Sequence, residues 1–485
     1  MKIHNSITPP IIRLMTLAMI WVGGIDSNHN LAARSINDIS IPNNPNVIII
    51  LTDDMGFADV GFNGCKDIPT PNIDRIANEG VKFTNAYVTY PVCGPSRAGI
   101  ITGRYQDRFG FGRNPLFAVK DVEMGLPLEE ETLAEMLKKA GYNSTAIGKW
   151  HLGAHPALRP LNRGFDAFFG FLSGGHQYFP DALTLQDEYD VKAQFDAYKT
   201  KLLRNNTRIN EKEYLTDAFS REAVDAIERN KDNAFFIYLA YNAPHTPLQA
   251  TEKYLKRFEN IKDEKRRTYA AMVSAVDDGV GLILNKLEEL DIAENTIIFF
   301  LSDNGGPEAT NGSDNGILRG GKSELFDGGI HVPFAMRWPA KIKKSMTYEA
   351  PIISLDIAGS VLSQVNPQIQ IKNPLDGVNL IPFLLKEQQG APHEHLYWRK
   401  FDQNQYACLA SNGEKLAFIK NEEMFFNLSK DPSESRNIKE QNSKSEALKS
   451  IFEMWRAAMK DPVFMGLESD KAYNELHPER YLKDK

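Results

Sequence analysis

Four apolar runs along the chain each end in polar, titratable residues. The runs at 46–52 and 296–302 are continuous and rich in β-branched or aromatic residues. Continuous apolar character is typical of strands that are buried on both faces, as in a parallel sheet. The run at 234–240 has the same character, and a weaker one lies at 144–147. We therefore predict four strands of a largely parallel sheet.

Helical patterns lie between these runs. The segment 128–140 has three glutamates near its start and two lysines near its end, and Gly141 follows it. That charge order complements a helix dipole, and glycine is a usual stop. Residues 268–290 form a second amphipathic stretch. Strands alternating with helices predict an α/β fold, with a large doubly wound, mixed or mostly parallel sheet flanked by helices. In such sheets ligands bind beyond the carboxyl ends of the strands.

The pattern changes after about residue 386. Short strand-like runs separated by turn residues lie at 396–399, 406–409, 415–419 and 424–426, and an amphipathic stretch follows at 444–460. We predict a smaller C-terminal antiparallel sheet with one helix. The expected domains are thus a main α/β domain at 31–385 and an α+β subdomain at 386–485, which should help to shape the cleft at the mouth of the site.

The first 24 residues combine Lys2 and Arg13 with an apolar run at 14–24. This run is shorter than the roughly 20 apolar residues of a membrane span and fits the apolar region of a secretory signal. We expect residues 1–30 to be a signal peptide and linker, and the protein to be exported to the periplasm or secreted. A buried or unstructured segment is the alternative. No later run is long and apolar enough for a membrane span.

Composition excludes several classes of protein. The chain has 485 residues, of which 42% are hydrophobic and 25% charged, so it is not collagen-like, coiled-coil or wholly disordered. Its net charge of −7 gives no general attraction to nucleic acid, and an anionic ligand would need a local cluster of cations. The three cysteines, Cys65, Cys93 and Cys408, are too few for a disulfide scaffold. The sequence allows a disulfide between Cys65 and Cys408 but does not establish one.

Polar residues at two strand ends indicate a metal site. Asp53 and Asp54 follow the run at 46–52, and Asp303 and Asn304 follow the run at 296–302. Carboxylate and amide oxygens suit Ca²⁺ or Mg²⁺, whereas zinc favours histidine and cysteine. Asp53 and Asp54 can both reach one ion only where the strand breaks, which Gly56 permits. A turn or a helix cap is the alternative for either pair alone.

A further motif surrounds Cys93. Residues 93–104 read Cys-Gly-Pro-Ser-Arg-Ala-Gly-Ile-Ile-Thr-Gly-Arg, and Pro95 suits the first turn of a helix. Cys93 would then lie beside a helix N-terminus, where partial positive charge stabilises an anion, with Arg97 one turn along. A cysteine phosphatase, with Cys and Arg bracketing a phosphate loop six residues apart, is excluded because position 99 is Gly. A buried free cysteine is the structural alternative.

These motifs resemble the signature of the type I, formylglycine-dependent sulfatases of the alkaline phosphatase superfamily. That signature is Cys or Ser, any residue, Pro-Ser-Arg and then Leu-Thr-Gly-Arg, with Ile101 at the Leu position here. The resemblance covers most of the chain, in order through Pro45-Asn46-Val47, Asp53-Asp54, Gly148-Lys149-Trp150-His151, Ala243-Pro244-His245, Ser302-Asp303-Asn304-Gly305, Arg319-Gly-Gly-Lys322 and the segment 425–434. It implies an alkaline-phosphatase-like fold.

The resemblance also implies a cofactor and a modification. Cys93 would be oxidised after translation to formylglycine (3-oxoalanine), whose hydrate is the nucleophile. A formylglycine-generating or anaerobic sulfatase-maturating enzyme would be the partner for that step. One Ca²⁺ per active site would be held by five residues: Asp53, Asp54, Asp303, Asn304 and the modified Cys93.

The remaining roles follow from the same resemblance. Arg97 and His151 would support the nucleophile. The sulfate would be held, and departure of the alcohol assisted, by Lys149, His245 and Lys322. His176, in a Gly-rich loop, and Arg319 are candidate substrate contacts.

This set predicts hydrolysis of sulfate esters, with a sulfated carbohydrate (polysaccharide or oligosaccharide) as substrate. The runner-up is a phosphatase or phosphodiesterase of the alkaline phosphatase superfamily. Against it, two-zinc members usually have Asp-His where this chain has Asp303-Asn304, and a Ser or Thr nucleophile. A third hypothesis is an inactive relative that only holds sulfated sugar.

Overall fold

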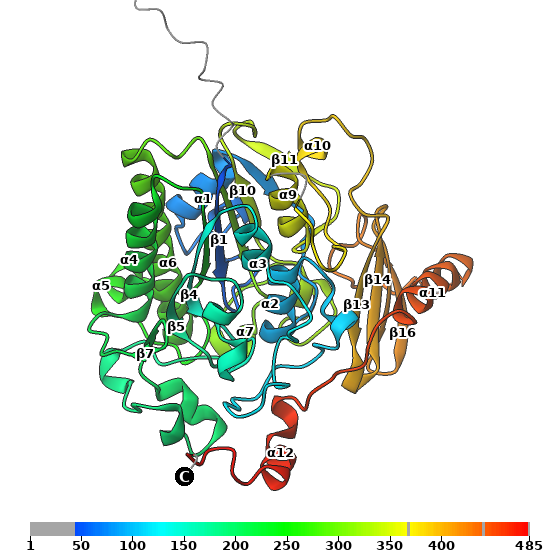
Figure 1. The fold of residues 1–485 in the computed structure, drawn as a ribbon. Coiled ribbons are helices and arrows are strands. Elements are labelled where there is room, and N and C mark those ends of the chain that lie inside the picture. Colours follow the sequence, from blue (N-terminus) through cyan, green and yellow to red (C-terminus); the bar gives the residue numbers. More distant parts are fainter. Residues whose placement is uncertain (1–43, 366–368, 439–441, 484–485) are drawn as a thin grey trace, which may run out of the picture. The chain divides into compact units, whose positions relative to one another are not determined.

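The run at 46–52 forms β1 (Asn46–Thr52), which lies in the middle of a ten-stranded sheet. The computed structural model describes residues 44–365, 369–438 and 442–483 (Figure 1). β1 pairs in parallel with β9 (Thr296–Ser302) and with β8 (Phe235–Ala240). β4 (Asn143–Lys149) and β5 (Ala167–Phe171) continue the parallel array beyond β8. The four predicted strands are confirmed.

Antiparallel strands extend both ends of this sheet. β10 (Phe334–Arg337) pairs antiparallel with β9 and with β2 (Val81–Phe83), and β11 (Met346–Tyr348) is added beside β2. At the other end β6 (Leu203–Arg204) pairs antiparallel with β5 and with β7 (Thr207–Arg208). The sheet is therefore mixed and mostly parallel, as expected.

Helices cover both faces of the sheet because successive side chains of each strand point in opposite directions. Ile48 and Ile50 of β1 belong to one buried core, whereas Ile49 and Leu51 belong to another. The first core includes α1 (Pro71–Asn78), α4 (Leu215–Asn230) and α6 (Glu264–Glu289). The second includes α2 (Cys93–Thr102), α3 (Leu133–Lys138) and α9 (Asp356–Gln364). Figure 1 shows these two helical layers on opposite sides of the strands, which is the predicted doubly wound arrangement.

The helix predicted at 128–140 begins later than its charge pattern indicated. Thr132 caps α3: its side chain accepts a hydrogen bond from the Glu135 backbone at 3.1 Å, and Glu135 accepts one from the Thr132 backbone at 2.7 Å. This Thr-x-x-Glu capping box fixes the helix start after the three glutamates. By contrast, α6 covers most of the predicted 268–290 stretch.

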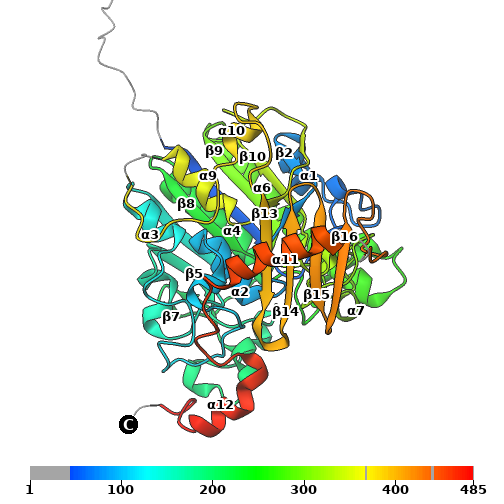
Figure 2. The same cartoon turned by 90° about the vertical axis from the view of Figure 1, so that its right-hand side faces the viewer.

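A separate four-stranded antiparallel sheet follows, as predicted. Its strands are β13 (His395–Lys400), β14 (Gln405–Ala410), β15 (Glu414–Ile419) and β16 (Glu422–Asn427). α11 (Asn442–Arg456) crosses this sheet (Figure 2) and buries Leu448 and Phe452 against it. The remaining elements are the pair β3 (Ala86–Tyr87) and β12 (Ile352–Ile353), with α5 (Glu252–Leu255), α7 (Glu308–Asn311), α8 (Asp327–Ile330), α10 (Ile381–Leu384) and α12 (Asp470–Leu476).

A buried ion-pair cluster joins this smaller sheet to α8 and to β3. Lys415 of β15 is fully buried, and its Nζ lies 2.7 Å from Asp327 Oδ1 and 2.8 Å from Glu434 Oε1. Asp327 also accepts a hydrogen bond from the Tyr87 hydroxyl at 3.0 Å. The cluster thus fixes the start of α8, five residues after Lys322, against the C-terminal sheet.

Among the described residues, no helix has both the length and the apolar character needed to cross a bilayer. The proposed signal segment at 1–30 lies outside the described residues.

Candidate active site

Three carboxylates converge where β1 and β9 end. Asp53 and Asp54 follow β1 and Asp303 follows β9, and the two strands pair as far as Thr52 and Ser302. Each carboxylate offers an oxygen within 4.8 Å of those of the other two, and all three side chains are buried. The two acidic pairs of the sequence meet because their strands are neighbours.

The strand breaks at Asp54 itself, before the glycine expected to permit the break. Asp54 has a φ of 65°, in the left-handed region that few non-glycine residues adopt. Its backbone N–H donates to Asp303 Oδ1 at 3.3 Å, and Asn304 Nδ2 donates to its carboxylate at 2.7 Å. The turn therefore lets two consecutive aspartates reach one site.

Three cations pair with these carboxylates, of which Arg97 and Lys149 are buried and Lys322 is partly exposed. Lys149 Nζ lies 2.5 Å from Asp53 Oδ2, and Arg97 Nε donates to Asp303 Oδ2 at 2.8 Å. Lys322 Nζ lies 2.8 Å from Asp54 Oδ2. Although burial opposes ionisation of Asp54, Lys322 and His245 outweigh it and lower its pKa to about 2.

The pKa of Asp303 shifts in the opposite direction, because the effect of burial exceeds that of the nearby cations. Burial, followed by repulsion from Asp53, raises the pKa of Asp303 to about 6 despite the nearby Arg97. The carboxylates thus repel one another even though each is paired with a cation. A divalent cation beside the carboxylates would relieve this repulsion.

The donor set fits a hard cation. Asp53 Oδ1 and Asn304 Oδ1 are buried and have no hydrogen-bond partner among the described residues. Unpaired buried oxygens are costly, and Ca²⁺ is bound by carboxylate and amide oxygens. The residues that could hold the ion are Asp53, Asp54, Asp303 and Asn304, with residue 93 beside them.

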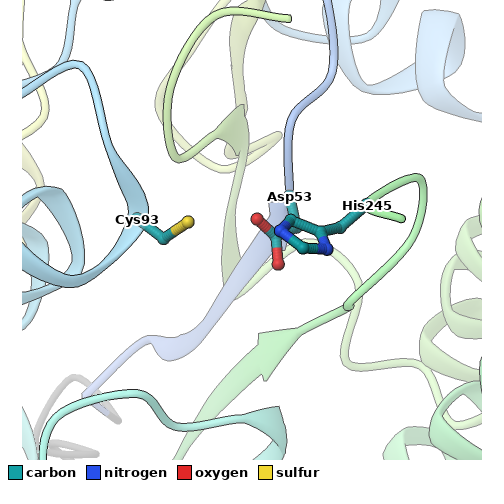
Figure 3. A group of neighbouring side chains, drawn as sticks. All are labelled: Asp53, Cys93 and His245. Carbon is teal, nitrogen blue, oxygen red and sulfur yellow. The ribbon is translucent and has the colours of Figure 1, made fainter. Parts of the chain in front are cut away.

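Cys93 begins α2, and its side chain points toward Asp53 and His245 (Figure 3). Its Sγ and one ligand atom of each of those two residues lie within 4.8 Å of one another. Burial raises the pKa of the Cys93 thiol to about 11, with Lys149 and Lys322 only partly opposing it. The unmodified residue is therefore a thiol near neutral pH, which does not favour a thiolate nucleophile.

Two histidines complete the floor of the site. His151 has a φ of 56°, and its ring packs against Gly174, where a Cβ would come within 2.8 Å of Nε2. Burial, together with Lys149, holds the pKa of His151 well below its usual range. His245 Nδ1 lies 2.5 Å from the Thr246 carbonyl, and burial and Lys322 lower its pKa to about 3. Both rings are neutral near pH 7.

A cavity of about 580 Å³ opens above this floor. Cys93, His151, His245 and Lys322 line its base. The walls come from four other segments, containing Arg113 and Asn114, Gln194 to Tyr198, Lys400 to Gln403, and Gly466 to Ser469. The expectation that the C-terminal region borders the site is confirmed by the last two segments.

Two predicted substrate contacts lie elsewhere. His176 is fully buried, packs on Phe171 in a tilted arrangement with ring centroids 4.5 Å apart, and does not line the cavity. Arg319 donates to the Glu434 carbonyl at 2.9 Å and lies over the Phe326 ring, also outside the cavity lining. The structure brings together all the other predicted site residues.

The cysteines are all free. Cys65 lies near Asp67, 3.3 Å from its carboxylate, and Cys408 is buried in the C-terminal sheet. The bridge left open by the sequence is therefore absent from the described residues.

The sequence also leads us to expect that the loops 105–120, 154–215 and 305–320 set the substrate specificity. The first two of these loops contribute Asn114 and Tyr198 to the cavity wall, although no motif marks either residue singly. Lys400 lies in a segment that the sequence did not mark, and only its place in the folded chain shows that it lines the cavity.

Comparisons with known proteins agree with this geometry. The Sulfatase family model matches residues 45–367, and the model for the C-terminal region of N-sulphoglucosamine sulphohydrolase matches residues 321–460. N-acetylgalactosamine-6-sulfatase of Mus musculus is 32% identical over 448 residues, which cover 83% of this chain and 84% of the mouse protein. The uncharacterized sulfatase YdeN of Escherichia coli is 32% identical over 418 residues, covering 74% and 70%.

A solved structure is similar over its whole length. The crystal structure of Ps i-CgsB in complex with k-i-k-neocarrahexaose has a TM-score of 0.83 and 35% identity, covering 91% of this chain and 100% of that chain.

Proposed function

This chain belongs to the sulfatase family and is a sulfuric ester hydrolase, and from that premise we propose that it releases sulfate from sulfated carbohydrate. One observation supports this most directly. Cys93, two histidines and Lys322 line the base of a single cavity, directly beside a carboxylate cluster able to hold a cation. An anionic ester entering that cavity meets positive charge where its sulfate would lie.

Two groups would complete the site. We propose Ca²⁺ on Asp53, Asp54, Asp303, Asn304 and residue 93, and formylglycine in place of Cys93. When present, the cation would stabilise negative charge and the hydrated aldehyde would supply the nucleophilic oxygen.

The lysines would bind and orient the sulfate. Lys149 and Lys322 pair with Asp53 and Asp54 in the structure, and a cation on those carboxylates would leave both ammonium groups for sulfate oxygens. Their charge would then stabilise the charge that develops on the sulfonyl oxygens during transfer. Arg97, fixed to Asp303, would hold that carboxylate in place beside the nucleophile.

The histidines would move protons. His151 is neutral, and its buried Nδ1 has no partner among the described residues, so it is placed to accept a proton from the nucleophile. His245 is held neutral by burial and Lys322. A bound sulfate ester would offset the charge of Lys322, raise the pKa of His245, and favour proton donation to the leaving oxygen.

A carbohydrate substrate is supported by the cavity and by the relatives. The cavity is lined by many side chains able to form hydrogen bonds with hydroxyl groups, among them Asn114, Gln194 and Gln403. The similar structure of Ps i-CgsB is a complex with k-i-k-neocarrahexaose, a six-sugar chain by its name.

Export and maturation belong to the same proposal. Residues 1–30 would direct the protein to the periplasm or outside the cell, and a formylglycine-generating or anaerobic sulfatase-maturating enzyme would convert Cys93. In the proposed division into two domains, residues 31–385 would hold the reaction centre and residues 386–485 would contribute part of the cavity wall.

A panel of defined sulfated oligosaccharides and phosphate esters tests the function. We expect free sulfate from at least one oligosaccharide, using protein whose Cys93 conversion is established by mass spectrometry. Faster hydrolysis of phosphate mono- or diesters than of every sulfate ester would favour the phosphatase alternative instead.

A further inference from the structure

The turn Gln194–Lys199 forms a cavity wall that the reaction proposed above does not use. Phe195 and Tyr198 of this turn both line the cavity, and their rings meet edge to face with centroids 5.6 Å apart. Phe195 is 60% exposed, unusually open for a large apolar side chain. Single exposed apolar residues are common on protein surfaces, so the exposure of Phe195 does not by itself indicate a binding site.

This turn is held rigidly on both sides of Phe195. Gln194 is buried, and its Oε1 accepts hydrogen bonds from the Phe117 backbone at 2.9 Å and from Arg480 Nη2 at 2.6 Å. Asp196 accepts hydrogen bonds from two backbone N–H groups at the start of the turn, at 3.1 and 3.2 Å. Phe195 is therefore presented to solvent by an anchored scaffold, which reduces the entropy lost when a ligand packs on it.

Tyr198 lies closer to the reaction centre than Phe195. Its ring packs on Gly175, where a Cβ would come within 2.7 Å of the ring, and the preceding Gly174 packs on His151 in the same way. Among the described residues the Tyr198 hydroxyl has no hydrogen-bond partner. The wall thus runs from His151 through Tyr198 outward to Phe195.

We propose that this aromatic wall is a sugar subsite: Tyr198 contacts the sulfated sugar, and Phe195 stacks on the next sugar of the chain. One face of a pyranose ring is made of C–H groups, which match the flat, electron-rich face of an aromatic ring. The Tyr198 hydroxyl can both donate to and accept from a sugar hydroxyl. The substrate class is then an oligosaccharide or polysaccharide sulfate, not a monosaccharide sulfate. This inference rests on the proposed function.

The test compares two substrates that share the same sulfated sugar, a monosaccharide sulfate and a trisaccharide that contains it. We expect the wild-type enzyme to have a higher kcat/KM for the trisaccharide. Phe195→Ala should lower the trisaccharide value by about two- to tenfold, mainly through KM, and leave the monosaccharide value unchanged. Phe195→Trp should retain the trisaccharide preference, whereas Phe195→Leu, which is apolar but not flat, should lose it.

Leu282→Ala is the matched control, because Leu282 is 54% exposed on α6 and does not line this cavity. Leu282→Ala should leave kcat/KM unchanged for both substrates. If Phe195→Ala lowers kcat/KM equally for both substrates, or lowers it for neither, the proposed subsite is wrong. If converted wild-type protein releases sulfate from no carbohydrate, the proposed function itself has failed, which is a different outcome.

Discussion

The ammonium group of Lys149 lies 2.5 Å from Oδ2 of Asp53, and neither side chain is exposed. A buried lysine that faces a carboxylate behind the base of a cavity has two possible anionic partners, the protein's own aspartate and a sulfate bound in the cavity. A cation held by Asp53 would decide between them, because it would engage the aspartate and leave the lysine for the sulfate. The pair would therefore couple ion binding to substrate binding.

Lys149→Met should lower kcat/KM for sulfate release by about 10²- to 10³-fold, because a charge that stabilises the transition state is lost. Lys138→Met is the control, since Lys138 is largely exposed and pairs with Asp166 at the surface. Circular dichroism should show both variants folded. Activity within twofold of wild type in folded Lys149→Met would contradict the assigned role.

Cys93→Ala should abolish turnover and leave the fold intact, because residue 93 would supply the nucleophile in the proposed function but forms only a small part of the core. Released sulfate and the melting temperature measure the two effects. Cys65→Ala, at a half-buried cysteine elsewhere in the chain, should keep full activity. Normal sulfate release by purified Cys93→Ala would remove the mechanism proposed here.

Removal of divalent cations should lower thermal stability, because three carboxylates within 4.8 Å of one another would then repel each other without a metal ion between them. Calcium at 100 times its Kd should raise the free energy of unfolding by about 2.7 kcal/mol. Asp54→Asn should reduce that gain, whereas Asp67→Asn, at an exposed carboxylate, should not. A gain of equal size in both variants would place the ion elsewhere. Calorimetry with and without a chelator measures these shifts.

One pH effect arises far from the active site. His393 Nε2 lies 2.7 Å from Oδ1 of the buried Asp356. Burial opposes protonation of His393, but Asp356 outweighs it, so the pKa of His393 is raised above its ordinary value. The stabilisation is therefore complete below the unfolded-state pKa of His and is lost as the pH rises through the raised value.

We expect His393→Leu to lower the free energy of unfolding by about 1.5–3 kcal/mol near pH 5.5, and by less near pH 9. Urea unfolding at several pH values measures the difference. His477→Leu is the control, because the His477 side chain is 45% exposed and, among the described residues, lies near no buried carboxylate. A cost that does not change with pH would show that His393 acts only through packing.

The carboxylate cluster of this site was predictable from the residues at two strand ends, whereas the roles of Cys93 and Lys149 came only from the resemblance to the sulfatase family. Asp53 and Asp303 end two apolar runs, and runs that pair in parallel bring their ends together. The start of α3 was also encoded, in the Thr132–Glu135 capping box, but the glutamates before it masked that signal. The positions of Phe195 and Lys400 were not predictable, because they depend on how distant loops and the C-terminal sheet pack around the cavity.

Lys400 to Gln403 and Gly466 to Ser469 border the cavity, yet none of them belongs to the carboxylate cluster or its cations. Reaction and selection are thus encoded in separate stretches of the chain. Insertions or substitutions in these stretches would change which sulfated carbohydrate is accepted without disturbing the ends of β1 and β9. The same reaction centre would then serve differently sulfated substrates through changes in the cavity wall alone.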